Sequence, residues 1–396
     1  MQQSHPGSIA PASERDCDTS SVNTSRLLQV GDAVVEVDIA DLSVLRSFGF
    51  SSSPLATEGT PDHRIRIRPS EVGHELVIDD DAVYRASDAG NVVDHLVAWC
   101  NRRAIESRPA AVNIHAAGLV APGSDRTIIV PGSPGAGKTT LAATACRRGW
   151  GYLSDEMVSV EHDTIRAYPK PLTVKRGALP FVDDVDLTRY ELSPQQTRWY
   201  VSVAELGGWV TQQGHPHAVA FIAYDDDNDT AVTELGVGEA TVALAVNCQQ
   251  ELDDHGRKLL QLARLADASV CVELEHRDLD EAMGVLADLA KRDGTPSGEV
   301  APLPPVVRRA NAGPAVAAGV SGVVTPDGVV VHRHETDAIA LLDPLAGAIW
   351  RLLDGSAPVD ELVTDLADAF DHPVAAVRAD VSRLLDQLTE TGFVDA

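Results

Sequence analysis

The residues best suited to chemistry form a glycine-rich run in the first half of the chain. The phosphate-binding pattern G-x-x-x-x-G-K-[ST] is matched by Gly132-Ser133-Pro134-Gly135-Ala136-Gly137-Lys138-Thr139-Thr140. The apolar run 127–130 before it predicts a buried strand, and the Ala-rich run 140–146 after it predicts a helix. In this setting the loop amides and the helix N-terminus can bind phosphate oxygens. Lys138 can then reach the β- and γ-phosphates and Thr139 can hold Mg²⁺, which predicts ATP binding. The alternative is a glycine-rich turn that happens to end in Lys-Thr.

A kinase also needs a carboxylate that accepts the proton of the hydroxyl being phosphorylated. Asp155 and Glu156 supply one, because they lie in a short apolar segment, 151–160, one strand after the helix of the loop. The alternative is that this acidic pair only forms a turn.

Two further groups of residues have both a functional and a structural interpretation. His115 lies in the apolar segment 112–118, where a lone histidine is usually a core residue. Lys170, Lys175 and Arg176 form a local basic patch in a very acidic chain. The patch either contacts phosphates or an acidic acceptor, or is a solvated turn.

Composition limits the class of protein. The chain has 396 residues and a formal net charge of −27, which disfavours nucleic acid and anionic membranes as partners. The sequence contains neither a run of transmembrane length nor an apolar N-terminal signal segment, and its five scattered cysteines form no zinc-binding pattern. These features predict a cytoplasmic protein with reduced thiols.

The pattern of elements predicts several domains of mixed α/β type. The expected order is a disordered N-terminus at 1–25, an α+β region at 26–105, a P-loop α/β domain at 106–292, a linker at 293–315 and a winged-helix domain at 316–396. In the last domain, strands are expected at 322–324, 329–332 and 338–342, followed by three helices. The first of these helices has Asp343 as its N-cap and Pro344 at its first position.

The central segments together resemble the HPr kinase/phosphorylase family. The residues that carry the resemblance are His115-Ala116-Ala117-Gly118, the loop 132–139 and Leu153-Ser154-Asp155-Glu156. The resemblance implies that Asp155 is the catalytic base, close to His115, and that Glu156 supports metal or water. Thr139 stands where the family has Ser, and Glu156 stands where it has a second Asp. Members of this family commonly assemble into oligomers, so a homo-oligomer is one expectation.

The last 80 residues are similar to the PqqD-type peptide chaperones. The similarity is carried by the segment 334–355 and the two helices that follow it. It implies that residues 316–396 bind the leader of a ribosomally made precursor peptide, which adds a strand to an exposed sheet edge. Together the two resemblances imply an ATP- and Mg²⁺-dependent kinase that acts on a Ser or Thr hydroxyl of such a peptide.

Two other functions compete with this hypothesis. A winged helix can bind DNA in a nucleotide-sensing regulator, but residues 313–396 contain fourteen Asp or Glu, four Arg and no Lys. That balance is opposite to the basic surface that DNA readers need. The other alternative is a kinase of a small hydroxyl metabolite, or a nucleotide-driven switch without chemistry, which the loop motif does not exclude.

Overall fold

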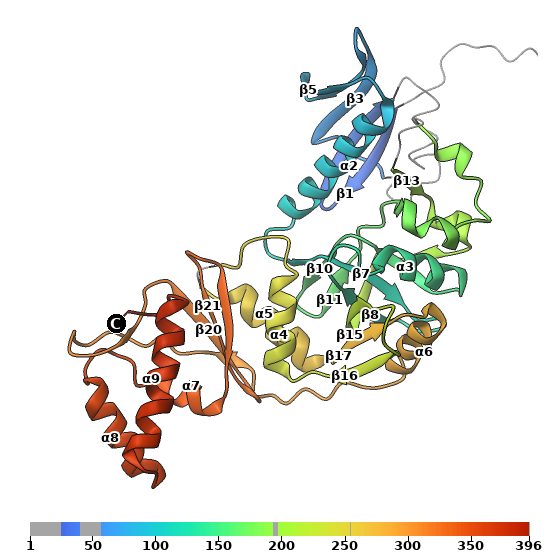
Figure 1. The fold of residues 1–396 in the computed structure, drawn as a ribbon. Helices are drawn as coiled ribbons and strands as arrows, with labels where there is room; N and C mark the ends of the chain where they lie inside the picture. Colours follow the sequence, from blue (N-terminus) through green and yellow to red (C-terminus); the bar gives the residue numbers. More distant parts are fainter. Residues whose placement is uncertain (1–24, 40–56, 193–196, 254, 396) are drawn as a thin grey trace, which may run out of the picture.

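The computed structural model describes residues 25–39, 57–192, 197–253 and 255–395. The N-terminus expected to be disordered therefore lies outside the described residues, except for residue 25, which begins the first strand. Figure 1 shows three parts in chain order, with a central α/β part between an N-terminal sheet and a C-terminal helical unit. None of the helices in the described ranges has both the length and the apolar character needed to cross a membrane.

The N-terminal part is a five-stranded sheet with one helix packed on it. The strands follow chain order, and β2 and β3 are the parallel pair. Alternating apolar residues of the strands and one face of the helix form a single core. The bounds are β1 Ser25–Val30, β2 Ala33–Ile39, β3 His63–Ser70, β4 Gly73–Ile78, β5 Asp81–Ala86 and α2 Ala89–Glu106.

The central part is built on a ten-stranded sheet in which three neighbouring strands are parallel. β8 pairs with β15 and β15 pairs with β17, all in parallel, while β7 joins β8 and β9 antiparallel. The strands are β6 Val112–Ile114, β7 Ala116–Val120, β8 Arg126–Pro131, β9 Gly151–Ser154, β10 Val158–Glu161, β11 Thr164–Arg166, β14 Trp209–Val210, β15 Gln213–Tyr224, β16 Ala231–Glu234 and β17 Val270–His276.

Helices cover both faces of this sheet, because its strands are apolar on both sides. One core contains residues of α3 (Lys138–Arg147) and α6 (Leu279–Leu289) together with the hairpin of β12 (Leu172–Lys175) and β13 (Arg198–Val201). The other core contains residues of α4 (Val237–Val246) and α5 (Arg257–Ala268). Three short 3₁₀ segments, Arg176–Phe181, Leu187–Tyr190 and Val203–Leu206, lie around the β12–β13 hairpin. Cys100, Cys146, Cys248 and Cys271 are free thiols.

The C-terminal part has the strands and helices that the sequence predicts. The sheet order is β18-β20-β21-β22, with bounds Ala301–Pro302, Val320–Thr325, Gly328–Arg333 and Ala338–Leu342. The helices are α7 Pro344–Trp350, α8 Val359–Phe370 and α9 Val374–Glu390, and β19 (Ala315–Val316) pairs with β23 (Val394–Asp395). Asp343 caps α7 by accepting a hydrogen bond from the Ala346 amide, as its position in the sequence predicts. The segment 293–315 also contributes structure, since it contains β18.

The C-terminal sheet is buried on both faces. Val329 and Val331 face the core formed with α7, α8 and α9, whereas Val323 and Val330 belong to the same core as α4 and α5. Asp327, in the turn between β20 and β21, accepts hydrogen bonds of 2.7 and 3.0 Å from the Gly238 amide at the start of α4. The C-terminal unit is therefore packed directly on the central part.

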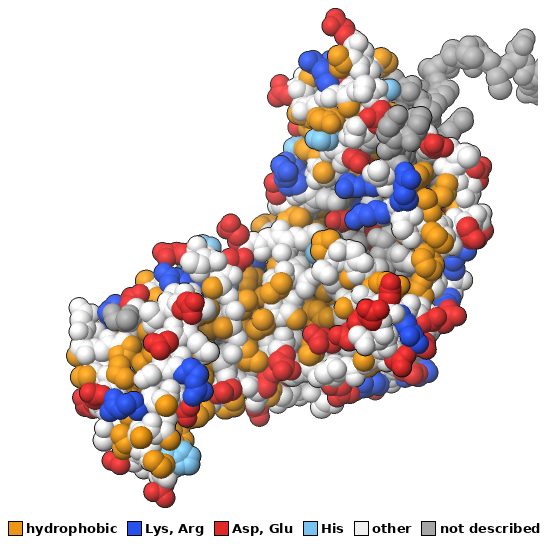
Figure 2. All heavy atoms as spheres, viewed as in Figure 1, with side chains coloured by type: hydrophobic (Ala, Val, Ile, Leu, Met, Phe, Trp, Pro, Cys, Tyr) orange, Lys and Arg blue, Asp and Glu red, His pale blue; other side chains and the backbone are white. Residues whose placement is uncertain are grey.

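The visible surface carries charges of both signs and some exposed apolar side chains. In Figure 2, apolar side chains gather over the C-terminal helices. Phe370 and Val374, on either side of the turn between α8 and α9, are 50% and 44% exposed.

Candidate functional site

The glycine-rich loop lies between β8 and α3, in the strand–loop–helix arrangement that its motif requires. Gly135 and Gly137 have φ of +97° and +93°, a conformation that favours glycine. A Cβ atom on Gly132 would lie 2.9 Å from the Ile222 carbonyl oxygen of β15. These glycines therefore allow the loop to wrap closely over the ends of β8 and β15.

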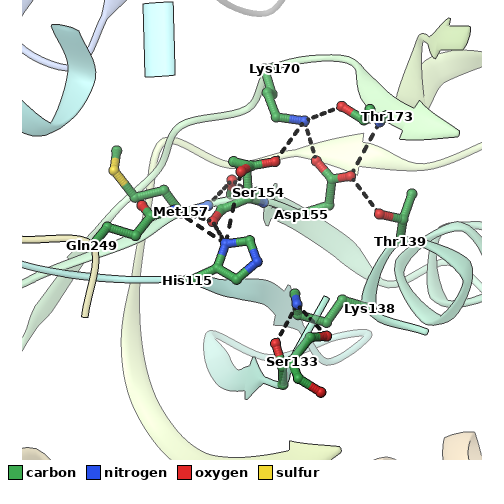
Figure 3. Close-up of polar contacts among 12 residues, drawn as sticks. His115, Ser133, Lys138, Thr139, Ser154, Asp155, Met157, Lys170, Thr173 and Gln249 are labelled. Atoms are coloured by element: carbon green, nitrogen blue, oxygen red, sulfur yellow. Dashed lines mark hydrogen bonds and ion pairs between the residues drawn. The ribbon is translucent and has the colours of Figure 1, made fainter. Parts of the chain in front are cut away.

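Lys138 is the first residue of α3 and points back over its own loop. Its Nζ donates hydrogen bonds to the carbonyl oxygens of Gly132 and Ser133 (Figure 3). Burial lowers the pKa of Lys138, while the nearby carboxylates of Glu156 and Asp155 oppose that shift. The ammonium is held at the mouth of the loop, where the motif places a phosphate-binding lysine.

Asp155 is completely enclosed by hydrogen-bond donors. Its Oδ1 accepts from Tyr152 Oη at 2.9 Å and Lys170 Nζ at 2.7 Å. Its Oδ2 accepts from Thr139 Oγ1 at 3.1 Å and the Thr173 amide at 3.3 Å. Burial would raise the pKa of Asp155, but the Lys170 ammonium and these hydrogen bonds outweigh it and the pKa is lowered. The carboxylate is therefore ionised and fixed against the loop threonine.

Of the three basic residues expected near the site, only Lys170 is an integral part of it. The Lys170 side chain is 4% exposed, and its Nζ also donates to Thr173 Oγ1 at 2.8 Å. Lys175 and Arg176 are exposed. Lys175 nevertheless lies close enough for its charge to depress the pKa of Lys138.

A tight turn presents the acidic pair. Ser154, the last residue of β9, accepts hydrogen bonds through its hydroxyl from the amides of Glu156 and Met157, at 3.1 and 3.0 Å. This local arrangement is typical of serine at a turn. It directs Asp155 into the protein and leaves the Glu156 side chain 28% exposed.

His115 lies beside Glu156, in the short connection between β6 and β7. Its Nδ1 is 3.0 Å from the Glu156 carbonyl oxygen and 3.8 Å from Glu156 Oε1. Gln249, from the segment after α4, places its Nε2 3.2 Å from the same ring nitrogen. Burial and the Lys138 charge lower the pKa of His115, although Glu156 opposes them. Figure 3 shows the imidazole between the 154–157 turn and Lys138.

Sequence reasoning missed three residues of this cluster: Tyr152, Thr173 and Gln249. Tyr152 is the residue before Leu153-Ser154, and its aromatic side chain in a short strand looks like an ordinary core residue. Thr173 lies only three residues after Lys170 and contacts Asp155 through its main-chain amide, whereas Gln249 comes from a segment distant in sequence. Only the polar character of Gln249-Gln250 at the end of an apolar helix hints at a role.

The Thr139 hydroxyl and the Asp155 carboxylate suit a Mg²⁺ ion that is also bound by phosphate oxygens. Within the described residues there is no group of three or more His, Cys, Asp or Glu that could hold a metal by itself. Mg²⁺ is usually bound through one or two carboxylates plus phosphate oxygens and water rather than by an all-protein cage. The Thr139 hydroxyl and the ionised Asp155, 3.1 Å apart, fit that pattern.

Comparison with known proteins bears on the C-terminal part. Residues 328–394 match the family model described as coenzyme PQQ synthesis protein D (PqqD). Residues 328–394 form a PqqD domain. A solved structure described as "TbiB1 in Complex with the TbiA(beta) Leader Peptide" matches at 21% identity over 21% of this chain and 95% of that chain, with a TM-score of 0.20. No curated protein matches the chain.

Proposed function

We propose that this protein is an ATP- and Mg²⁺-dependent kinase that phosphorylates a Ser or Thr hydroxyl of a precursor peptide. The observation that carries the proposal is the hydrogen bond between Thr139 of the loop and the buried Asp155. A loop hydroxyl and an adjacent strand-end carboxylate are the two protein groups that hold Mg²⁺ in P-loop nucleotide hydrolases.

In this proposal the loop binds the phosphates, and the residues around Asp155 prepare the metal site. The amides of the loop and the Lys138 ammonium bind the phosphates, and Lys138 exchanges its present carbonyl partners for phosphate oxygens. Thr139 and Asp155 hold Mg²⁺, which neutralises charge on the phosphates when bound. Tyr152, Lys170 and the Thr173 amide keep Asp155 in place.

The acceptor hydroxyl attacks the γ-phosphorus of ATP. The bond from its oxygen to phosphorus forms, the bond from phosphorus to the β–γ bridging oxygen breaks, ADP leaves, and the hydroxyl proton passes to a carboxylate. The family resemblance implies Asp155 as that carboxylate. The hydrogen bonds favour Glu156, because both oxygens of Asp155 already have donors whereas Glu156 is partly exposed beside His115. We therefore propose Glu156 as the proton acceptor.

The PqqD domain provides a surface for the peptide leader. Among the described strands β22 pairs with β21 alone, and β18 covers the opposite edge of the sheet. The outer edge of β22 can therefore accept a peptide strand through main-chain hydrogen bonds. Leu345, three residues after the end of β22, is 52% exposed and offers an apolar contact for the added strand.

A nucleotide titration tests the first requirement of this proposal. Isothermal titration of the intact protein with ATP and Mg²⁺ is expected to show one site, and Lys138→Ala is expected to weaken it by about tenfold or more. Lys291→Ala, an exposed lysine in the segment after α6, is the matched control and should bind as the unchanged protein does. Equal affinity in Lys138→Ala and the unchanged protein would contradict a phosphate-binding role for the loop.

A further inference from the structure

His276 is the last residue of β17 and lies beside the glycine-rich loop. β17 is parallel to β15, and β15 is parallel to β8, the strand that leads into the loop. The carboxyl ends of these strands therefore meet at one edge of the sheet, which is where ligands bind in open α/β sheets. Figure 1 shows the three strands side by side.

The imidazole of His276 directly adjoins the loop. A Cβ atom built on Gly137 would lie 3.9 Å from both Cε1 and Nε2 of His276. Gly137 is the residue just before Lys138 and caps the N-terminus of α3. The ring of Tyr224, at the end of β15, lies edge-on to the histidine with ring centroids 5.9 Å apart, and Tyr224 is 56% exposed.

His276 is buried without polar partners. It is 2% exposed, and neither ring nitrogen has a hydrogen-bond partner in the part of the chain that the structure describes. Buried polar groups are almost always paired, so a buried ring with two unpaired nitrogens needs an explanation. The polar contacts around Asp155 and His115 do not include it.

The chemistry of the ring indicates what it can bind. Burial lowers the pKa of His276, against the influence of Asp278, so the ring is neutral near pH 7. A neutral imidazole has one N–H donor and one acceptor nitrogen. Groups that both donate and accept, such as ribose hydroxyls and the edges of a nucleobase, match it better than a phosphate, which only accepts.

We infer that His276 binds the nucleoside part, the ribose or base, of the nucleotide whose phosphates occupy the loop. Tyr224 presents an exposed aromatic ring next to it, on which a base can stack. This inference rests on the proposed nucleotide binding and adds the part of the site that distinguishes a nucleotide from a bare polyphosphate.

The test compares ATP with inorganic tripolyphosphate, each titrated with Mg²⁺ into the intact protein. His276→Phe keeps an aromatic ring of similar size and removes both nitrogens. It should weaken ATP binding by about tenfold, the effect of losing one or two hydrogen bonds, and leave tripolyphosphate binding within about twofold. His276→Asn retains a donor and an acceptor and is expected to recover part of the affinity for ATP. His215→Phe, at an exposed position on β15, is the control and should change neither titration.

The possible results separate a failure of the His276 inference from a failure of nucleotide binding as such. Unchanged ATP affinity in His276→Phe would overturn the inference, and so would an equal loss for ATP and tripolyphosphate, because that would show a distorted loop. Thermal unfolding of each variant shows whether it is folded. If the unchanged protein binds neither ligand, the proposed function itself fails, and that result is distinct from a failure of His276.

Discussion

Asp155 and Glu156 are neighbours in sequence, but the fold gives them different surroundings. Asp155 faces four donors inside the protein, and Glu156 lies partly exposed between His115 and Lys170. A carboxylate with a lowered pKa is a poor proton acceptor and stays anionic. In the proposal Mg²⁺ takes the place of the Thr139 hydroxyl proton at Oδ2, while the other donors keep the carboxylate in position.

This contrast predicts separable effects of two conservative substitutions. Glu156→Gln should keep the affinity for ATP with Mg²⁺ and reduce turnover by about a hundredfold or more, because it removes only the proton acceptor. Asp155→Asn should weaken the dependence of ATP binding on Mg²⁺. Steady-state rates and titrations with and without Mg²⁺ measure both. Full turnover in Glu156→Gln would return the role of proton acceptor to Asp155.

The buried ion pair between Lys170 and Asp155 also predicts a stability effect. Lys170→Met leaves an uncompensated charge on a carboxylate whose side chain is 1% exposed. Removal of one partner of a buried pair usually costs about 3–5 kcal/mol in the free energy of unfolding. Lys175→Met, at an exposed position five residues away, should change that free energy by less than about 0.5 kcal/mol. Denaturant unfolding measures both changes. If Lys170→Met lowers the free energy of unfolding no more than Lys175→Met does, the ion pair does not stabilise the fold.

At the residue scale the sequence predicted the loop and the acidic pair, because both are short motifs carried by contiguous residues. It could not distinguish Lys170 from Lys175, since the difference arises from where β12 and the 154–157 turn meet. The positions of Gln249 and His276 beside the loop and the acidic pair could not be predicted for a similar reason. They approach the site only through the packing of segments distant in sequence.

At the scale of elements, the open edge of β22 has a measurable consequence. Addition of a leader peptide should slow amide hydrogen exchange in Ala338–Leu342, because a paired strand protects main-chain amides. Protection confined to β18, at the opposite edge, would contradict the proposed binding edge. Hydrogen exchange followed by mass spectrometry, with and without the peptide, distinguishes the two.

The elements of the PqqD domain were predictable because their signals are local. The strand expected at 338–342 occurs with those bounds, and the three helices expected after it are present as α7, α8 and α9. Three consecutive valines, 329–331, break the alternation of a strand with one solvated face. The structure gives the reason: Val330 packs towards α4 and α5, and its neighbours pack towards the C-terminal helices. The sequence of β21 alone does not show that helices cover both faces of its sheet.

At the scale of the whole molecule, the C-terminal domain and the central part share a core. Deletion of residues 313–396 would therefore expose apolar side chains of α4 and α5, and it would test folding rather than peptide capture. The same packing predicts that the two parts unfold together. Calorimetry should show no separate early transition for the PqqD domain, and two well-resolved transitions for these parts would contradict the shared core.

Substitution of Asp327 perturbs the contact between the C-terminal domain and α4 less than deletion of residues 313–396 does. Its carboxylate binds the Gly238 amide at the N-terminus of α4, so Asp327→Ala should cost about 1 kcal/mol of stability, as the loss of a helix cap does. Asp365→Ala, on α8 and without a part in this contact, is the control and should be close to neutral. Thermal unfolding measures the difference, and equal midpoints for the two variants would contradict a role of Asp327 in holding the domain.

The proposed peptide-kinase activity can be measured by mass spectrometry of a precursor peptide encoded beside the gene, after incubation with the protein, ATP and Mg²⁺. A peptide kinase is expected to add one phosphoryl group to a Ser or Thr, and the group should be absent when Lys138→Ala replaces the unchanged protein. An unmodified peptide that still binds the protein would contradict the peptide-kinase proposal while leaving the PqqD domain as a leader-binding unit. A peptide that neither binds nor reacts would contradict both, and a small hydroxyl metabolite would become the acceptor to test.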